Sequence, residues 1–166
     1  MKILDTLSEE FQHEAAITRR ALERLPEASF GWKPHEKSMP AARLACHIAE
    51  IPGWIVPALD QDELVFDPAT FKPWIAAGSA ELLAKFDANV AAGLACFTRH
   101  EDSVLAGMWS LKSPTETFLT MPKAAVLRGF VLSHLIHHRG QMSVYLRLLN
   151  VPVPSIYGPS ADEAPM

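Results

Sequence analysis

Proline divides this 166-residue chain into segments that can and cannot form helices. There are 13 prolines, yet the stretches 1–25, 74–113 and 123–151 contain none, and neither does the shorter stretch 41–51. Proline breaks a helix interior because it lacks a backbone N–H and clashes with the preceding turn, but it fits first turns and loops. The proline-free stretches therefore mark where helices can run.

Apolar residues recur at three- and four-residue steps in these stretches, which is the period of one helical face. The first stretch has such a face, made of Leu4, Leu7, Phe11, Ala15, Thr18, Leu22 and Leu25, and Pro26 ends this helix. The pattern predicts three further helices: one from 38–40 that Pro52 and Pro57 kink or end, one from Ser79 as its N-cap, and one over about 122–150.

The connections between the predicted helices are long. Residues 100–120 lack a sustained period and are expected to form a crossover, without a pair of strands. The tail after Val151 is rich in proline and small residues and is expected to be extended. Four helices with such connections predict an all-α fold, a four-helix bundle with long crossover connections, in one domain over residues 1–166.

Composition excludes several functional classes. The formal net charge of −4 argues against binding to a nucleic-acid backbone, which requires a basic surface. No run of about 18 apolar residues is present, so no membrane span is expected. The N-terminus meets Asp5 before any apolar segment, so no secretory signal is expected. Cys46 and Cys96 are therefore expected to be free, buried thiols in a reducing cytoplasm.

The fourth predicted helix carries polar residues where apolar ones are expected. Its inward seam, at alternating four- and three-residue steps, consists of Leu127, Val131, His134, His138, Gln141, Tyr145 and Leu148. Burying two imidazoles and an amide is unfavourable unless they are paired or ligated. Side chains at i and i+4 start about 5–6 Å apart on one face, so His134 and His138 are close enough to share a metal ion.

The HxxxH spacing alone is a weak indication of a metal site. Leu135 stands where a thermolysin-type peptidase has a glutamate after its first histidine, which argues against that class. A third ligand is available in His47, on the inward face of the second predicted helix. A lone inward histidine is more commonly a hydrogen-bonded core residue. Together, the three imidazoles can form a three-histidine site with a position open for water or substrate.

The sequence gives weaker indications of the roles of the polar residues near these histidines. Glu50, one turn after His47, either orients a ligand or is a solvated helix charge. His137 and Arg139 lie about 100° from the histidine pair around the helix and are expected to face a neighbouring helix or solvent. No phosphate-binding glycine loop, dinucleotide fingerprint or CxxC motif is present, and no catalytic residue is nominated. The remaining histidines are expected at the surface or in loops: His13, His35 and His100.

Three segments carry a resemblance to a known family. They are His134-Leu-Ile-His-His138-Arg-Gly-Gln141, Leu44-Ala-Cys-His47-Ile-Ala-Glu50 and the tail Val153-Pro-Ser-Ile-Tyr157-Gly-Pro-Ser. With them, essentially the whole chain resembles the DinB/YfiT-like family. The resemblance implies a four-helix bundle with long crossovers, often a homodimer, and a divalent metal ion held by His47, His134 and His138. It does not imply DNA binding.

The resemblance leaves two functional hypotheses. Characterised members of the family include thiol-dependent transferases and isomerases, so one hypothesis is a metal-dependent enzyme that activates a low-molecular-weight thiol or water to attack a small-molecule substrate. The alternative is a non-catalytic or stress-related helical bundle in which the metal ion is structural or sensory. Imidazole ligands do not discriminate among Zn, Ni and Fe. The roles of Glu50, Gln141 and Tyr157 stay open.

Overall fold

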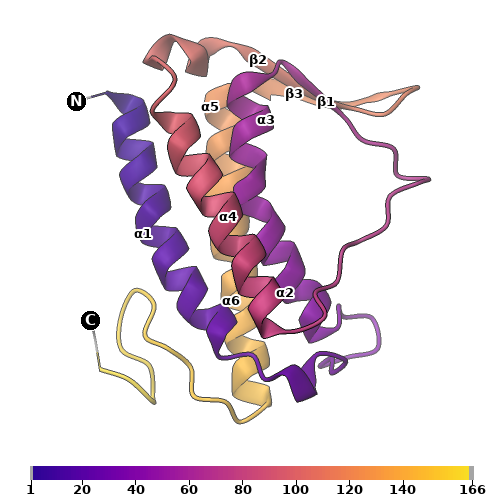
Figure 1. Cartoon of the computed structure of the whole chain (residues 1–166), viewed down its shortest axis with the longest axis vertical. Coiled ribbons are helices and arrows are strands. Elements are labelled where there is room, and N and C mark those ends of the chain that lie inside the picture. The colour runs from indigo at the N-terminus through magenta and orange to yellow at the C-terminus, as the bar shows by residue number, and fades with distance from the viewer. Residues whose placement is uncertain (1, 165–166) are drawn as a thin grey trace.

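Four long helices lie side by side along the long axis of the molecule in the computed structural model, which describes residues 2–164 (Figure 1). α1 and α2 each pack against both α4 and α6, so the four helices enclose a common apolar core. Their bounds are α1 (Ile3–Glu23), α2 (Ala41–Glu50), α4 (Ser79–Phe97) and α6 (His134–Leu148). A short 3-10 turn, η1 (Glu27–Ser29), follows α1.

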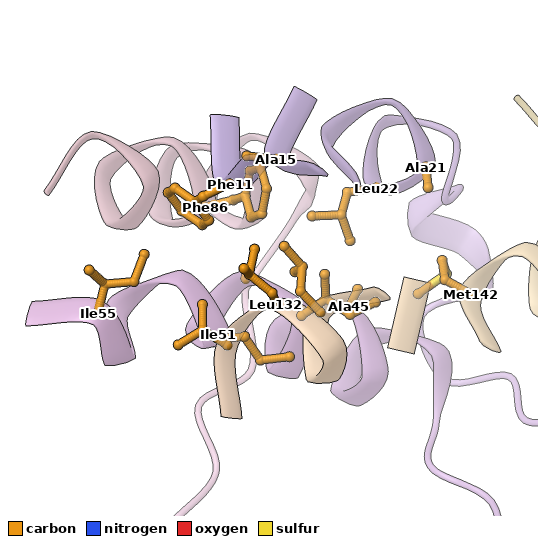
Figure 2. Packing of buried hydrophobic residues seen from close by; sticks show 14 of the residues in the cluster. Phe11, Ala15, Ala21, Leu22, Ala45, Ile51, Ile55, Phe86, Leu132 and Met142 are labelled. Atoms are coloured by element: carbon orange, nitrogen blue, oxygen red, sulfur yellow. The ribbon is translucent and has the colours of Figure 1, made fainter. Parts of the chain in front are cut away.

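The predicted inward face of the first helix is confirmed, since all seven of its residues are buried. Phe11 and Leu22 belong to the buried core cluster together with Phe86 of α4 (Figure 2). α1 ends before Pro26, which cannot continue a helix. The third predicted helix also begins where expected, although Gly78, and not Ser79, is its N-cap.

The second helical run continues across its prolines. α2 passes directly into a 3-10 segment, η2 (Ile51–Trp54), and then into α3 (Ile55–Asp60). Pro52 and Pro57 each stand in the first turn of the segment that contains them, where the fixed φ of proline suits the start of a helical segment. The run presents Ile51 and Ile55 to the core (Figure 2).

The predicted fourth helix is confirmed as one helical run, but its middle is a π-helix. It consists of α5 (Lys123–Val126), the π-helical segment η4 (Leu127–Ser133) and α6. A π-helix has more residues per turn than an α-helix, so it changes which later residues face inward. Met142 and Leu146 are buried on α6. The seam prediction was wrong for Gln141 and Leu148, which are exposed.

A small mixed sheet lies at one end of the helices, so the predictions of an all-α chain and of no strand pair were wrong (Figure 1). β2 (Met108–Lys112) pairs in antiparallel fashion with β3 (Thr117–Pro122) and in parallel fashion with β1 (Glu63–Val65). A 3-10 helix, η3 (Asp102–Ala106), precedes β2. The strands are short and mostly half-exposed, which weakens their sequence period. Trp109 anchors the sheet, because its buried indole donates a hydrogen bond to the Pro57 carbonyl at 3.0 Å.

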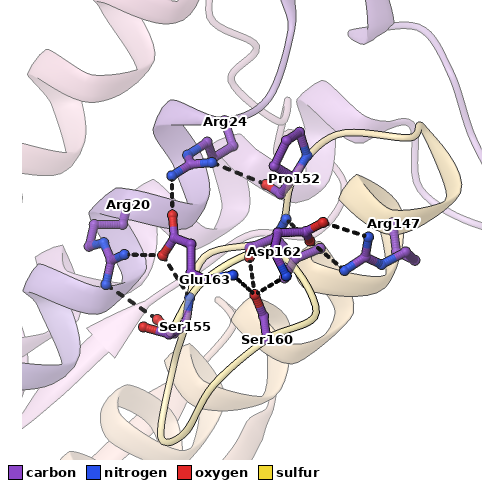
Figure 3. A network of polar contacts seen from close by, with 9 residues as sticks. Arg20, Arg24, Arg147, Pro152, Ser155, Ser160, Asp162 and Glu163 are labelled. Carbon is purple, nitrogen blue, oxygen red and sulfur yellow. Dashed lines mark hydrogen bonds and ion pairs between the residues drawn. The ribbon is translucent and has the colours of Figure 1, made fainter. Parts of the chain in front are cut away.

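The tail after α6 folds back along α1. Asn150 has a φ of 58°, and the N–H groups of Asn150 and Val151 close the end of α6 on the carbonyls of Arg147 and Leu146. Figure 3 shows the polar contacts that hold the tail, residues 152–163, against the helices. Ion pairs join it to α1 and α6: Glu163 to Arg20 and Arg24, and Asp162 to Arg147.

None of the helices within residues 2–164 has both the length and the apolar character needed to cross a membrane. Cys46 and Cys96 are both buried and unpaired, as expected. The Sγ of Cys46 accepts a hydrogen bond from the backbone N–H of Ala76, and Cys96 lies in the last turn of α4.

Candidate metal centre

The structure brings the three predicted histidines into one cluster. His47 comes from the last turn of α2, while His134 and His138 come from the first two turns of α6. One ring nitrogen of each lies within 4.8 Å of the others, and the Nε2 atoms of His47 and His134 are 3.1 Å apart. Nitrogens that share a tetrahedral zinc ion at about 2.0–2.1 Å are about 3.3 Å apart. The three side chains therefore fit a single small divalent ion.

Hydrogen bonds orient two of the three rings. The Nδ1 of His138 donates to the side-chain oxygen of Gln141 at 2.6 Å, and the Nδ1 of His134 donates to the Phe130 carbonyl at 3.3 Å. Each bond places the ring proton on Nδ1 and leaves a lone pair on Nε2. Metal-binding histidines in proteins are commonly held in this way. Gln141 thus orients His138 from an exposed position.

Burial favours the neutral form of all three imidazoles. It lowers the pKa of His47 to about 4, with smaller contributions from His138, His134 and Arg43. It is also the main cause of the lowered pKa of His134 and of His138. A neutral imidazole is the form that offers a lone pair to a cation. The cluster is therefore a group of neutral donors at physiological pH.

Glu50 takes the role of an ion-pair partner. Its carboxylate accepts a hydrogen bond from Arg43 at 3.0 Å, and both side chains are partly buried along α2. This pair occupies the same side of the helix as His47, one turn away in each direction. Glu50 is therefore neither a freely solvated charge nor in hydrogen-bond contact with the three rings.

The other histidines lie outside the cluster. His137 is exposed, as expected, with its ring centroid 4.8 Å from that of its neighbour His138. His13 and His35 are exposed as well. His100 is half-buried and bonded to Asp60, which the sequence did not indicate.

Two grooves lie near the histidine cluster, and one of them reaches it. The larger, of about 680 Å³, is lined by residues that include Glu50, Trp54 and Trp74, but by none of the three histidines. The other, of about 570 Å³, is mostly apolar and includes His134 in its wall. Its lining consists of Met121, Ala125, Gly129, Phe130, Ser133, His134 and His137. This second groove gives a small molecule access to the cluster.

A buried ion pair beside the cluster escaped the sequence analysis. Arg139 is 1% exposed and its guanidinium binds the carboxylate of Glu14, which is 5% exposed on α1. Tyr157 of the tail joins the pair, because its hydroxyl accepts from Arg139 at 2.6 Å and donates to Glu14 at 2.8 Å. The position of Glu14 within the apolar period of α1, one turn from Phe11 and from Thr18, was a usable signal. The network ties α6 to α1 and to the tail directly after His138.

Comparison with known proteins gives a consistent relationship. The model of the DinB family matches residues 1–165. The uncharacterized protein YrdA of Bacillus subtilis (strain 168) is 46% identical over 43 residues, which are 26% of this chain and 25% of YrdA. The match thus spans about a quarter of the length of that curated relative.

Two solved structures share the fold. A DinB-like protein from Bacillus cereus ATCC 10987 has a TM-score of 0.73 at 22% identity, over 94% of this chain and 98% of that one. A DinB-like protein from Bacillus subtilis, YjoA, has a TM-score of 0.70 at 18% identity, over 91% of this chain and 97% of that one. Since the family model spans nearly every residue and the fold agrees with these neighbours, the chain belongs to the DinB family.

Proposed function

We propose that His47, His134 and His138 bind one divalent metal ion, and that the chain is a metal-dependent enzyme activating a small thiol or water. The observation that carries this proposal is the convergence of three neutral imidazoles, with their ligand atoms within 4.8 Å of one another. Three protein ligands leave a coordination position open, which is typical of catalytic sites. Imidazole donors suit Zn, Ni and Fe alike.

Without a cation, the cluster is poorly compensated. The Nδ1 proton of His134 is used on the Phe130 carbonyl, so its Nε2 can only accept. The Nε2 of His47, 3.1 Å away, can satisfy the Nε2 of His134 only if it carries a proton and donates it. The Nε2 of His138 has a lone pair as well, so it is a further acceptor that needs a donor. Buried polar groups without partners are unfavourable. One divalent ion would satisfy all three lone pairs.

The surrounding residues define what such a site can act on. When bound, the metal ion supplies Lewis acidity that lowers the pKa of a thiol or of water. Phe130 and Met121 line the groove beside His134 and exclude water from its apolar wall. The groove therefore suits a small, largely apolar electrophile, oriented with its reacting end toward His134.

A non-catalytic role is the alternative, and one feature favours it. The three histidines link α2 to α6, so a bound ion would also hold two core helices together. In that case metal removal lowers thermal stability and no chemistry is lost. In the catalytic case the chelated protein stays folded and loses turnover.

Metal content and thiol chemistry test the proposed function. The chain, purified without a nickel column, is expected to retain at least one divalent ion, measured by elemental analysis. Chelation is expected to abolish the consumption of a small thiol with a chloronitroaromatic electrophile, or the hydrolysis of a small ester, and reloading is expected to restore it. Circular dichroism follows the fold in parallel. Equal turnover before and after chelation contradicts the catalytic role, and failure to retain or rebind an ion contradicts the metal site.

The assembly is a second proposal. We interpret the four long helices as a four-helix bundle with long crossovers that forms a homodimer, as the resemblance implies. Val144 and Leu148, one turn apart on α6, are each more than half exposed and offer an apolar contact. Sedimentation at micromolar concentration is expected to give twice the chain mass. A monomer under these conditions rejects the homodimer.

A further inference from the structure

We propose that Asp60, Cys96 and His100 form a second metal site, specific for Zn²⁺ or a cation of similar softness. Asp60 is the last residue of α3, Cys96 lies in the last turn of α4, and His100 follows α4 by three residues. One ligand atom of each lies within 4.8 Å of the others. Asp60 is 13 residues from His47 along the helical run, which corresponds to about 20 Å. The two clusters are therefore separate.

The donor set is one that zinc uses. Thiolate, imidazole and carboxylate are its protein ligands, and three of them leave a fourth position for water. Cys96 Sγ lies 3.4 Å from Asp60 Oδ1, close to the separation of about 3.6 Å between sulfur and oxygen ligands of one zinc ion. His100 Nε2 lies 2.7 Å from the same oxygen. This pair would separate by about half an ångström to admit the ion.

Arg99 holds the carboxylate of Asp60 in an orientation suited to metal binding. Its second oxygen accepts a hydrogen bond from Arg99 at 2.8 Å, which leaves Oδ1 for the cluster. Carboxylates that bind metal ions are commonly hydrogen-bonded on their other side. Cys96 is fully buried, whereas the side chains of Asp60 and His100 are 33% and 22% exposed. An ion can therefore reach the cluster from solvent.

In the structure, hydrogen bonds join the three side chains that would bind the ion. The thiol of Cys96 and the Nε2–H of His100 both donate to Asp60 Oδ1. Burial, together with Asp60, raises the pKa of Cys96 to about 11, so the thiol is protonated at neutral pH and is not a nucleophile. On binding Zn²⁺, the Cys96 proton goes to solvent and the Nε2 of His100 gives up its proton, so binding releases protons and is favoured as the pH rises.

Cobalt absorption tests the site directly. Reduced, chelated full-length protein is titrated with Co²⁺, and the near-ultraviolet charge-transfer band of a thiolate–Co²⁺ bond is followed. The three-histidine cluster contains no sulfur, so the band reports on the second site alone, whatever the outcome for the proposed function. We expect the band in the wild type, its loss when Zn²⁺ displaces Co²⁺, and its persistence in a His47→Ala/His134→Ala background.

Matched cysteine variants assign the ligand. Cys96→Ser is expected to lose the band, and Cys46→Ser, the other buried cysteine, is expected to keep it. His100→Asn, at a partly exposed position, is expected to keep the fold and to weaken Co²⁺ binding by at least about tenfold, because loss of even an indirect partner weakens metal binding by about 10–100-fold. Absence of a thiolate band in the wild type, its survival in Cys96→Ser, or unchanged affinity in a folded His100→Asn variant overturns the proposal.

Discussion

Alanine in place of His134 is expected to abolish stoichiometric metal binding at the three-histidine cluster, whereas alanine in place of His137 is expected to leave it intact. His134 offers its Nε2 lone pair to the cluster, and its ring is fixed by the Phe130 carbonyl. A structural zinc site has an apparent binding free energy of about 10–16 kcal/mol over four ligands, or about 3 kcal/mol for each. Loss of one ligand is therefore expected to weaken binding by at least about 100-fold.

The two variants make a matched pair. His137 is three residues further along α6, carries the same side chain and is exposed outside the cluster. Titration of chelated protein with Zn²⁺, using a competing chromophoric chelator, gives both affinities, and a Cys96→Ser background removes the thiolate ligand of the second site. His47→Ala is expected to behave like His134→Ala, because it removes the ligand supplied by α2. Equal zinc affinities of the His134→Ala and His137→Ala proteins would contradict the assignment of His134 as a metal ligand.

Replacement of Arg139 by methionine is expected to reduce the free energy of unfolding by about 3–5 kcal/mol. The substitution leaves Glu14 buried without the guanidinium that compensates its carboxylate, and breaking a buried ion pair on one side has this magnitude. The loss also frees Tyr157 from one of its two partners and so loosens the tail. Urea unfolding followed by circular dichroism measures the change.

Two companion variants separate the charge from the packing. Glu14→Gln combined with Arg139→Met removes both charges, and we expect it to recover most of the lost stability, because no buried charge is left uncompensated. Tyr157→Phe removes one hydroxyl and is expected to lose about 1 kcal/mol. A loss below about 1 kcal/mol in Arg139→Met, or a double variant less stable than the single one, contradicts the assigned role of the ion pair.

Local patterns in the sequence predicted most helices but not the sheet. The predicted inward face is buried at each of its residues from Leu4 to Leu22 in α1 and at Leu25 just after it, because a helix buried on one side repeats its apolar residues with the helical period. The strands of the sheet are short and largely exposed or half-exposed, so their residues show little alternation between apolar and polar side chains. The turn between β2 and β3 did carry a signal in Pro114, and the N–H of Ser113 bonds to the Glu116 carbonyl there.

The sequence predicted the three histidines of the candidate metal centre, but not which other residues of the same helix face inward. The inward positions of His47, His134 and His138, together with the family resemblance, predict one cluster, and the structure brings the three side chains together. Gln141 and Leu148 were misplaced because the π-helical segment changes the phase of the helix, which a regular 4-3 count cannot anticipate.

The sequence by itself determined where helices can run, because proline geometry and apolar spacing act within a few residues of the chain. It also determined which helix faces carry the three imidazoles. Only the tertiary structure decided which distant side chains meet. Glu14 and Arg139 are 125 residues apart, and Asp60 and His100 are 40 apart. Such contacts depend on how whole helices pack against one another, and no local pattern encodes that packing.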